Sequence, residues 1–173
     1  MPDAAPLKLR DRLIKRLDPY WKMEAANAAI VPLFVIWATG GRIGWITLAA
    51  LVPVVLLLVI GAVYWRSKVR QLRGEQRDLA PLLRRIGWWK RPSLLLTATG
   101  GAAALGGWLM PDWSVGLADR IAASSCALLA ALEYVNYYHR QLQHFDNWAD
   151  FKRLLKGQGF RRSSLAADLE QLG

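Results

Sequence analysis

The residues best suited to chemistry lie at the end of the last apolar stretch, in a polar run from Glu133 to Arg140. Four side chains of this run have the spacing i, i+3, i+4 and i+7, which places them on one face of a helix. They are Glu133, Asn136, Tyr137 and Arg140. A carboxylate, an amide, a phenol and a guanidinium on one intramembrane stripe are suited to holding a lipid headgroup, relaying protons or donating a hydrogen bond to a cofactor. This stripe is the candidate intramembrane polar site.

The same stripe also has a purely structural interpretation. A buried charge needs a partner, so Glu133 is suited to clamping helices together through Arg140 or through Asn27 of an earlier helix. We favour this clamp over a ligand site. Either interpretation makes the position of Glu133 important.

The sequence offers little support for metal or catalytic chemistry. His139 and His144 are five residues apart, so they do not share a helix face. The chain lacks Glu-x-x-His and His-x-x-x-His pairs, a glycine-rich phosphate loop and a nucleophile elbow. We predict no metal site and no catalytic residue, and the sequence assigns no cofactor. A membrane enzyme with Glu133 and His139 as acid and base would need a pocket that their helical phase does not support.

The end of the chain resembles a group of known proteins. The Glu-Tyr-Val-Asn-Tyr-Tyr-His run within Leu132–His139, the pair Gln141–Leu142 and the segment Arg161–Leu169 look like small multi-span membrane proteins of bacteria, including cyanobacteria, whose function is unassigned. The resemblance covers the final quarter of the chain. It implies a bacterial cytoplasmic membrane or a thylakoid, and it implies no activity.

Apolar blocks define the elements that must position these residues. Hydrophobic residues make up 54% of the 173 residues and fall into four stretches. A helix of about 20 apolar residues crosses the hydrocarbon core of a bilayer, which is roughly 30 Å thick. We therefore predict an all-α integral membrane bundle of four transmembrane helices. The expected spans are 23–39, 43–65, 92–110 and 121–139.

The fourth span can begin at two places. A start at Ile121 buries Glu133, whereas a start at Trp113 would bury Asp119 and Arg120. We favour Ile121, because Asp119 and Arg120 then fall in a polar loop after Pro111.

The third span contains small residues at four-residue spacing, namely Ala98, Ala102 and Gly106. Small residues on one helix face let another backbone approach closely, so we predict a helix-packing face and a central position for this helix. The alternative is close contact with a flat ligand such as a pigment or quinone.

Basic residues predict the orientation. All but two of the 23 lysines and arginines lie before the first span, in the loop 66–91 or in the tail from Arg140, and the exceptions are Arg42 and Arg120. Lysine and arginine in short loops stay on the cytoplasmic side, so both termini are predicted to be cytoplasmic.

The basic segments also predict partners. Leu9, Leu13 and Leu17 alternate with basic residues, which favours an amphipathic interfacial helix within 1–22. With a net charge of +10, the chain is expected to bind anionic lipid headgroups rather than nucleic acid.

The tail 140–173 is predicted to be helical and cytoplasmic. We expect the fourth helix to continue past the membrane and to present Leu142, Phe145 and Trp148 to a partner. A short capped helix is expected from Ser164 to Leu172.

These features favour a non-enzymatic membrane subunit or an assembly or accessory factor of a larger membrane complex. Its partner would be a membrane protein complex or further copies of the chain. The alternative is an oligomeric transporter or lipid-handling protein that uses the Glu133 stripe, because four helices are few for a transport pathway.

Overall fold

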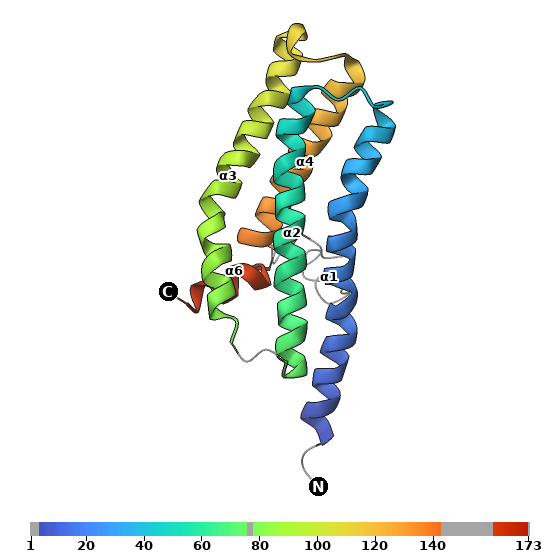
Figure 1. The fold of residues 1–173 in the computed structure, drawn as a ribbon. Helices are drawn as coiled ribbons and strands as arrows, with labels where there is room; N and C mark the ends of the chain where they lie inside the picture. The colour runs from blue at the N-terminus through green and yellow to red at the C-terminus, as the bar shows by residue number, and fades with distance from the viewer. Residues whose placement is uncertain (1–3, 76–77, 143–160, 173) are drawn as a thin grey trace, which may run out of the picture.

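The computed structural model describes residues 4–75, 78–142 and 161–172, and its described secondary structure is helical apart from one isolated bridge between Arg140 and Arg162. The helices are α1 (Ala4–Ala38), α2 (Trp45–Arg73), α3 (Ala80–Leu109), the 3-10 helix η1 (Pro111–Trp113), α4 (Leu117–Tyr138) and α6 (Ser164–Glu170). The predicted all-α class is confirmed. The four long helices form an up-and-down bundle, with η1 at one end and α6 near the other (Figure 1).

Helix α2 occupies the centre of the bundle, because it packs against α1, α3 and α4. Its aliphatic side chains point to every side and include the fully buried Val54 and Leu57. The sequence predicted a central third helix. This was wrong, because the bulky residues of α2 pack against three other long helices, whereas α3 packs against α2 and α4 and exposes much of its length.

One helix of the described residues, α2, is long and apolar enough to cross a membrane by itself. The central helix of a water-soluble bundle can be equally long and apolar. The length and composition of α2 therefore do not confirm the predicted four-span membrane bundle. The other long helices contain more polar groups, such as Glu24 in α1, Thr97 in α3 and Asp119 in α4.

Helices α1 and α3 extend beyond their predicted spans because their prolines do not end them. Helix α1 runs through Pro19 and Pro32, and α3 runs through Pro92. The expected separate segment 1–22 is therefore continuous with the first long helix from Ala4 onward. The expected loop 66–91 is mostly helical, and α2 ends where Gly74 adopts a left-handed conformation with φ of 79°.

Helix α4 differs from its predicted span at both ends. It begins at Leu117, which brings Asp119 and Arg120 into its first two turns rather than into a loop. It ends at Tyr138, so the prediction that this helix continues past His139 is wrong. His139 lies in a turn, Arg140 forms the isolated bridge with Arg162, and the Gln141 N–H donates to the Arg161 carbonyl at 2.8 Å.

The predicted helix near the C-terminus is present as α6. Its N-cap is Ser163, whose hydroxyl accepts a hydrogen bond from the Ala166 N–H at 3.0 Å. Leu165 of α6 is buried in a cluster with Tyr64 of α2, and the Tyr64 hydroxyl donates to Asp168 at 2.7 Å. Helix α6 therefore covers one end of the bundle.

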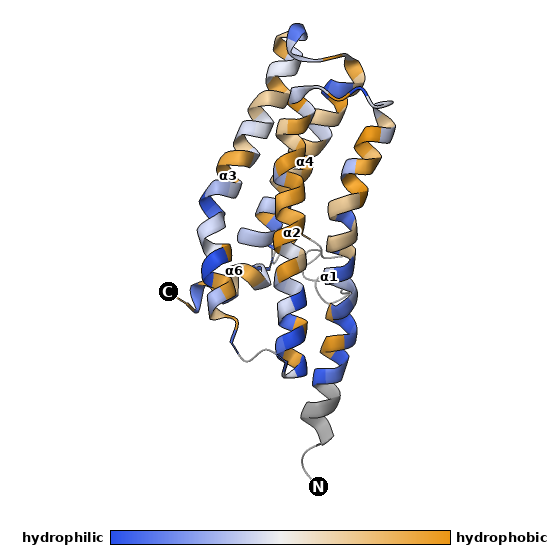
Figure 2. Ribbon diagram, in the orientation of Figure 1, coloured by the Kyte–Doolittle hydropathy of each residue, from blue (hydrophilic) through white to orange (hydrophobic). Residues whose placement is uncertain are grey.

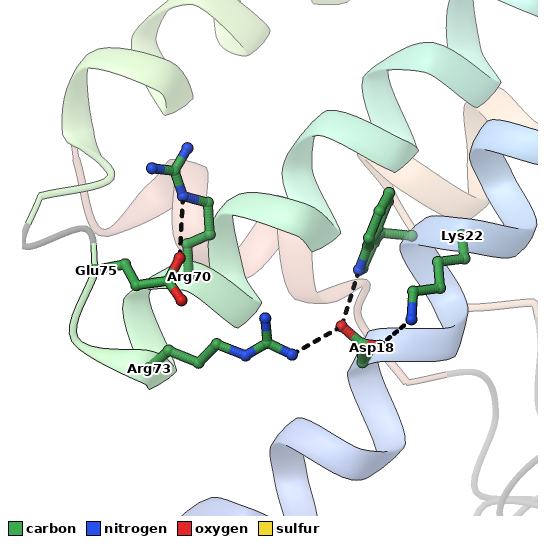
Figure 3. Close-up of polar contacts among 6 residues, drawn as sticks. Asp18, Lys22, Arg70, Arg73 and Glu75 are labelled. Carbon is green, nitrogen blue, oxygen red and sulfur yellow. Dashed lines mark hydrogen bonds and ion pairs between the residues drawn. The ribbon is translucent and has the colours of Figure 1, made fainter.

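We call this end, which carries α6 and the connection 74–79, the basic end, and the opposite end the η1 end. Hydrophilic residues gather toward the basic end, whereas most of the length above it is apolar (Figure 2). Asp18 connects α1 to α2 here, because it accepts from Lys22 at 2.5 Å, from the Trp21 indole at 3.2 Å and from Arg73 of α2 at 3.1 Å (Figure 3).

Candidate functional site

The stripe predicted from sequence is only partly brought together. Glu133, Asn136 and Tyr137 share the last turns of α4, but Arg140 lies beyond the end of the helix and is exposed. The Arg140 N–H donates to the Val135 carbonyl at 2.8 Å, which places Arg140 in the turn that closes α4. The i+7 position of the stripe is therefore lost.

Glu133 is half-buried, and its described polar partner is Asn136 in the same helix. The Asn136 amide donates to the Glu133 carboxylate at 3.4 Å. The side-chain carbonyl of Asn136 accepts from the Leu142 N–H at 2.9 Å, so this residue also holds the chain that follows α4. Among the described residues, Glu133 does not form the predicted clamp with Arg140 or with Asn27.

Tyr137 points from α4 into the bundle against α2. Its side chain is 3% exposed, and a Cβ at Gly61 of α2 would overlap its hydroxyl group. A glycine is thus required where the phenol meets α2. The Tyr137 hydroxyl forms no hydrogen bond of standard geometry with the described residues, and the carboxylates that act on it are Glu24 and Glu133.

Glu24 is the functional candidate that sequence reasoning missed. It lies in α1, is 3% exposed, and interacts with both Tyr137 and Glu133 of α4. A signal for it exists in the sequence, because Glu24 is the one charged residue from Met23 to Gly41. We call Glu24, Glu133 and Tyr137 the buried acidic cluster.

The chemistry open to this cluster is limited. Two carboxylates beside a phenol can share a proton or attract a cation. A hollow of about 30 Å³ lies between Tyr137 and Leu165 of α6, and neither Glu24 nor Glu133 lines it. It is large enough for a water molecule and too small for an organic substrate. The described residues contain no group of three or more metal-ligating side chains.

A second buried carboxylate, Asp119, fastens the η1 end. It is 1% exposed, and one of its oxygens accepts from the Gly44 N–H at 2.8 Å and from the Thr47 hydroxyl at 2.6 Å. Its other oxygen accepts from the Val115 N–H at 3.1 Å. Asp119 of α4 therefore caps the N-terminus of α2, where a carboxylate also interacts favourably with the helix dipole.

The predicted packing face on α3 is displaced around the helix. Ala98 and Ala102 are exposed, and Gly106 lies under the ring of Trp113. The face that packs against the bundle carries other small residues, namely Gly100, Ala103, Ala104 and Gly107. The closest approach to the backbone of another helix is at Gly100, where a Cβ would lie 2.9 Å from the Cα of Ala50 in α2.

The predicted partner-facing surface is described only at its first residue. Leu142 is half-buried, whereas Phe145, Trp148 and His144 fall outside the described residues. Helix α6 covers the neighbouring end of α2, where Lys68 pairs with Asp168 at 2.7 Å.

Comparisons of the chain with protein-family models, curated protein sequences and solved structures found no match. The resemblance of the end of the chain to small bacterial membrane proteins stays a prediction.

Proposed function

We propose that the chain is a non-enzymatic integral membrane protein, with four long helices that cross the bilayer, and that it serves as a subunit or as an assembly or accessory factor of a larger membrane complex. The observation that carries this proposal is the apolar outer surface of all four helices. Each of them has a large hydrophobic side chain that is more than half exposed. Examples are Leu33 on α1, Val52 on α2, Leu95 on α3 and Leu128 on α4.

So much exposed apolar surface is costly in water, and it usually marks contact with lipid or with another protein. Both ends of the bundle are suited to membrane interfaces. The ring centroids of Trp45 and Trp113 lie 5.0 Å apart in a tilted contact at the η1 end. Those of Tyr20 and Trp65 lie 5.9 Å apart nearer the basic end. Aromatic rings at two levels, with basic residues concentrated beyond one of them, are typical of helices with that end in the cytoplasm.

The non-enzymatic part of the proposal rests on the buried acidic cluster. Glu24 and Tyr137 are buried between packed helices, and Glu133 is half-buried beside them. A structural role therefore fits Glu24 and Glu133 better than substrate turnover does.

The outer face of α3 supports a role in assembly. Ala98 and Ala102 are exposed one turn apart, and we call them the small-residue strip. A strip of small residues among larger ones lets a helix of another membrane protein approach closely, and van der Waals packing then supplies the affinity.

Purification of the full chain from native membranes in mild detergent tests this proposal. We expect the chain to need detergent for extraction and to elute with a membrane partner or as an oligomer. Ala102→Leu should release that partner, and Ala131→Leu, the same change at an exposed alanine of α4, should not. A chain that is soluble without detergent, or a complex unaffected by Ala102→Leu, would contradict the proposal.

Glu24 supports a second candidate, an oligomeric proton or ion transporter, because it places a second buried carboxylate beside Tyr137 and Glu133. Proteoliposomes with an internal pH dye provide the test. Transport predicts a proton flux that Glu24→Gln abolishes, and the absence of flux in the wild type would refute this candidate.

A further inference from the structure

A cavity of about 760 Å³ lies at the basic end, where α3, the residues after α4 and α6 meet. Figure 1 shows α6 beside the lower part of α3. This volume falls within the range of small-molecule sites, about 300 to 1,000 Å³. The nitrogen-bearing side chains of its lining come from three separate segments of the chain. They are Arg84, Lys90, His139, Arg140 and Arg162.

The charge of the lining is strongly unbalanced. Among the described residues that line the cavity, Glu170 is the one carboxylate, and it pairs with Arg162. Lys90 lies close enough to His139 to act on it electrostatically. Like charges held together repel one another, and an anion bound between them relieves this repulsion.

One part of the lining is apolar. Leu83 of α3, Leu169 of α6 and Leu172 contribute to it. A ligand that fills the whole cavity therefore has an anionic group joined to an apolar portion. Guanidinium and ammonium groups are the side chains that recognise phosphate best, arginine through paired hydrogen bonds and lysine as a point charge.

The surroundings of the cavity match the headgroup level of a membrane. Trp88 lies two residues before Lys90 on α3 and is 88% exposed, and its neighbour Trp89 is 47% exposed. Tryptophan rings favour the boundary between hydrocarbon and headgroups. Basic pockets between helices on the cytoplasmic side are a known mode of anionic headgroup recognition.

We propose that this cavity binds the phosphate group of an anionic phospholipid, with Arg84 and Lys90 of α3 as its principal ligands and Leu83 and Leu169 against the apolar portion. The identification of the ligand as a lipid rests on the proposed membrane function. The identification of its anionic group as a phosphate does not, because a soluble phosphate ester would meet the same cationic groups.

The test uses the full chain and two double variants of equal charge. Arg84→Gln with Lys90→Gln removes two cationic groups that line the cavity. Arg85→Gln with Arg91→Gln removes two cationic groups from adjacent positions of α3 that do not line it. Native mass spectrometry in mild detergent measures binding of phosphatidylglycerol and of phosphatidylcholine, and calorimetry measures binding of inorganic phosphate. Circular dichroism melts establish that all three proteins are folded.

We expect wild type and the Arg85/Arg91 variant to bind phosphatidylglycerol within about twofold of each other and more tightly than phosphatidylcholine, because those arginines lie outside the cavity. The Arg84/Lys90 variant should lose about tenfold or more in affinity, because two charge-assisted contacts are removed.

An equal loss of affinity in both variants would mean that diffuse surface charge attracts the lipid, and it would contradict a binding site in the cavity. If inorganic phosphate binds as tightly as the lipid, with the same dependence on Arg84 and Lys90, the conclusion that the ligand is a phospholipid is wrong. A chain that is soluble without detergent would refute the membrane function, and the phosphate measurement would still decide whether the cavity binds this group.

Discussion

Asp119 satisfies three donors from two parts of the chain, and this makes the residue a sensitive point of the η1 end. Removal of its carboxylate leaves the Gly44 N–H and the Val115 N–H without their acceptor, whereas the Thr47 hydroxyl keeps the Asp119 backbone carbonyl at 2.9 Å. We expect Asp119→Ala to lower the free energy of unfolding by about 3 kcal/mol, from a lost cap and unsatisfied buried donors. Denaturant titration in detergent measures this.

Asp112→Ala is the control for this prediction, because Asp112 is an exposed carboxylate at the same end. A surface change of this kind should alter the free energy of unfolding by no more than about 0.5 kcal/mol. Equal effects of the two changes would show that Asp119 does not fasten α4 to α2.

Glu24 fills space in the buried acidic cluster, and its charge is costly there. Glu24→Gln keeps the shape and removes a buried charge, so we expect the free energy of unfolding to be unchanged or about 1 kcal/mol higher. Glu24→Ala should lower it by about 2 kcal/mol, because a cavity forms between α1 and α4. Glu133→Gln should have a smaller effect, because Glu133 is only half-buried.

Thermal melts of the three variants in one detergent compare these effects directly. A large loss of stability in Glu24→Gln would mean that the carboxylate charge itself holds the helices together.

At this scale the sequence predicted Glu133, Asn136 and Tyr137 on one face, because helical spacing is a local property. It could not predict that Glu24 approaches Tyr137 or that Asp119 meets Gly44, since both contacts join residues far apart in the chain. The prediction that Arg140 shares this face was wrong, because α4 ends at Tyr138.

Helix α3 packs through Gly100 rather than through the small-residue strip. A Cβ at Gly100 would lie 2.9 Å from the Cα of Ala50 and 3.0 Å from the carbonyl oxygen of Ala49, and a backbone cannot yield as a side chain can. We expect Gly100→Ala to lower the free energy of unfolding by about 1 to 3 kcal/mol through overpacking. Ala102→Leu should leave it unchanged in the isolated chain. The reverse order of effects in denaturant titration would place the packing face on Ala102.

The contact between α1 and α2 at the basic end depends on the charge of Asp18. Hydrogen bonds from the Lys22 side chain and then the Trp21 indole hold the pKa of the Asp18 carboxyl below its usual range. A group with a lowered pKa in the folded state contributes stability above its unfolded pKa, about 3.9 for aspartate, and loses it as the pH falls through the folded pKa.

The melting temperature of wild type relative to Asp18→Asn, measured between neutral pH and acid, tests this dependence. We expect the melting temperature of the wild type to exceed that of Asp18→Asn by a constant amount above about pH 5. This difference should shrink as the pH falls below the pKa of the carboxyl in the unfolded chain. An advantage that grows on acidification would contradict the role given to Asp18.

The number and order of the long helices follow from the apolar blocks, whereas their ends do not. Pro92 was expected to begin a helix, yet Leu83 and Ile86 before it pack into the core and extend α3 toward its N-terminus. Tertiary burial of that kind outweighs the loss of one backbone hydrogen bond at a proline.

For the whole molecule, the apolar outer surface and the basic end together specify an orientation that labelling can check. The segregation of charge could be predicted from sequence because it requires only counting. The central position of α2 could not, because it depends on how the side chains of all four helices interlock.

We expect the basic end to face the cytoplasm, because lysine and arginine in short connections are retained there. Cys126 is 3% exposed, so Cys126→Ala provides a cysteine-free background with a small change in the core. Exposed positions at the two ends then receive single cysteines: Arg42→Cys and Asp112→Cys at the η1 end, and Gln71→Cys and Ser164→Cys at the basic end.

In intact cells a membrane-impermeant maleimide should label only the first pair, and in permeabilised cells it should label all four. Labelling of the second pair in intact cells would invert the topology, and labelling of neither pair before permeabilisation would remove the membrane-spanning arrangement altogether.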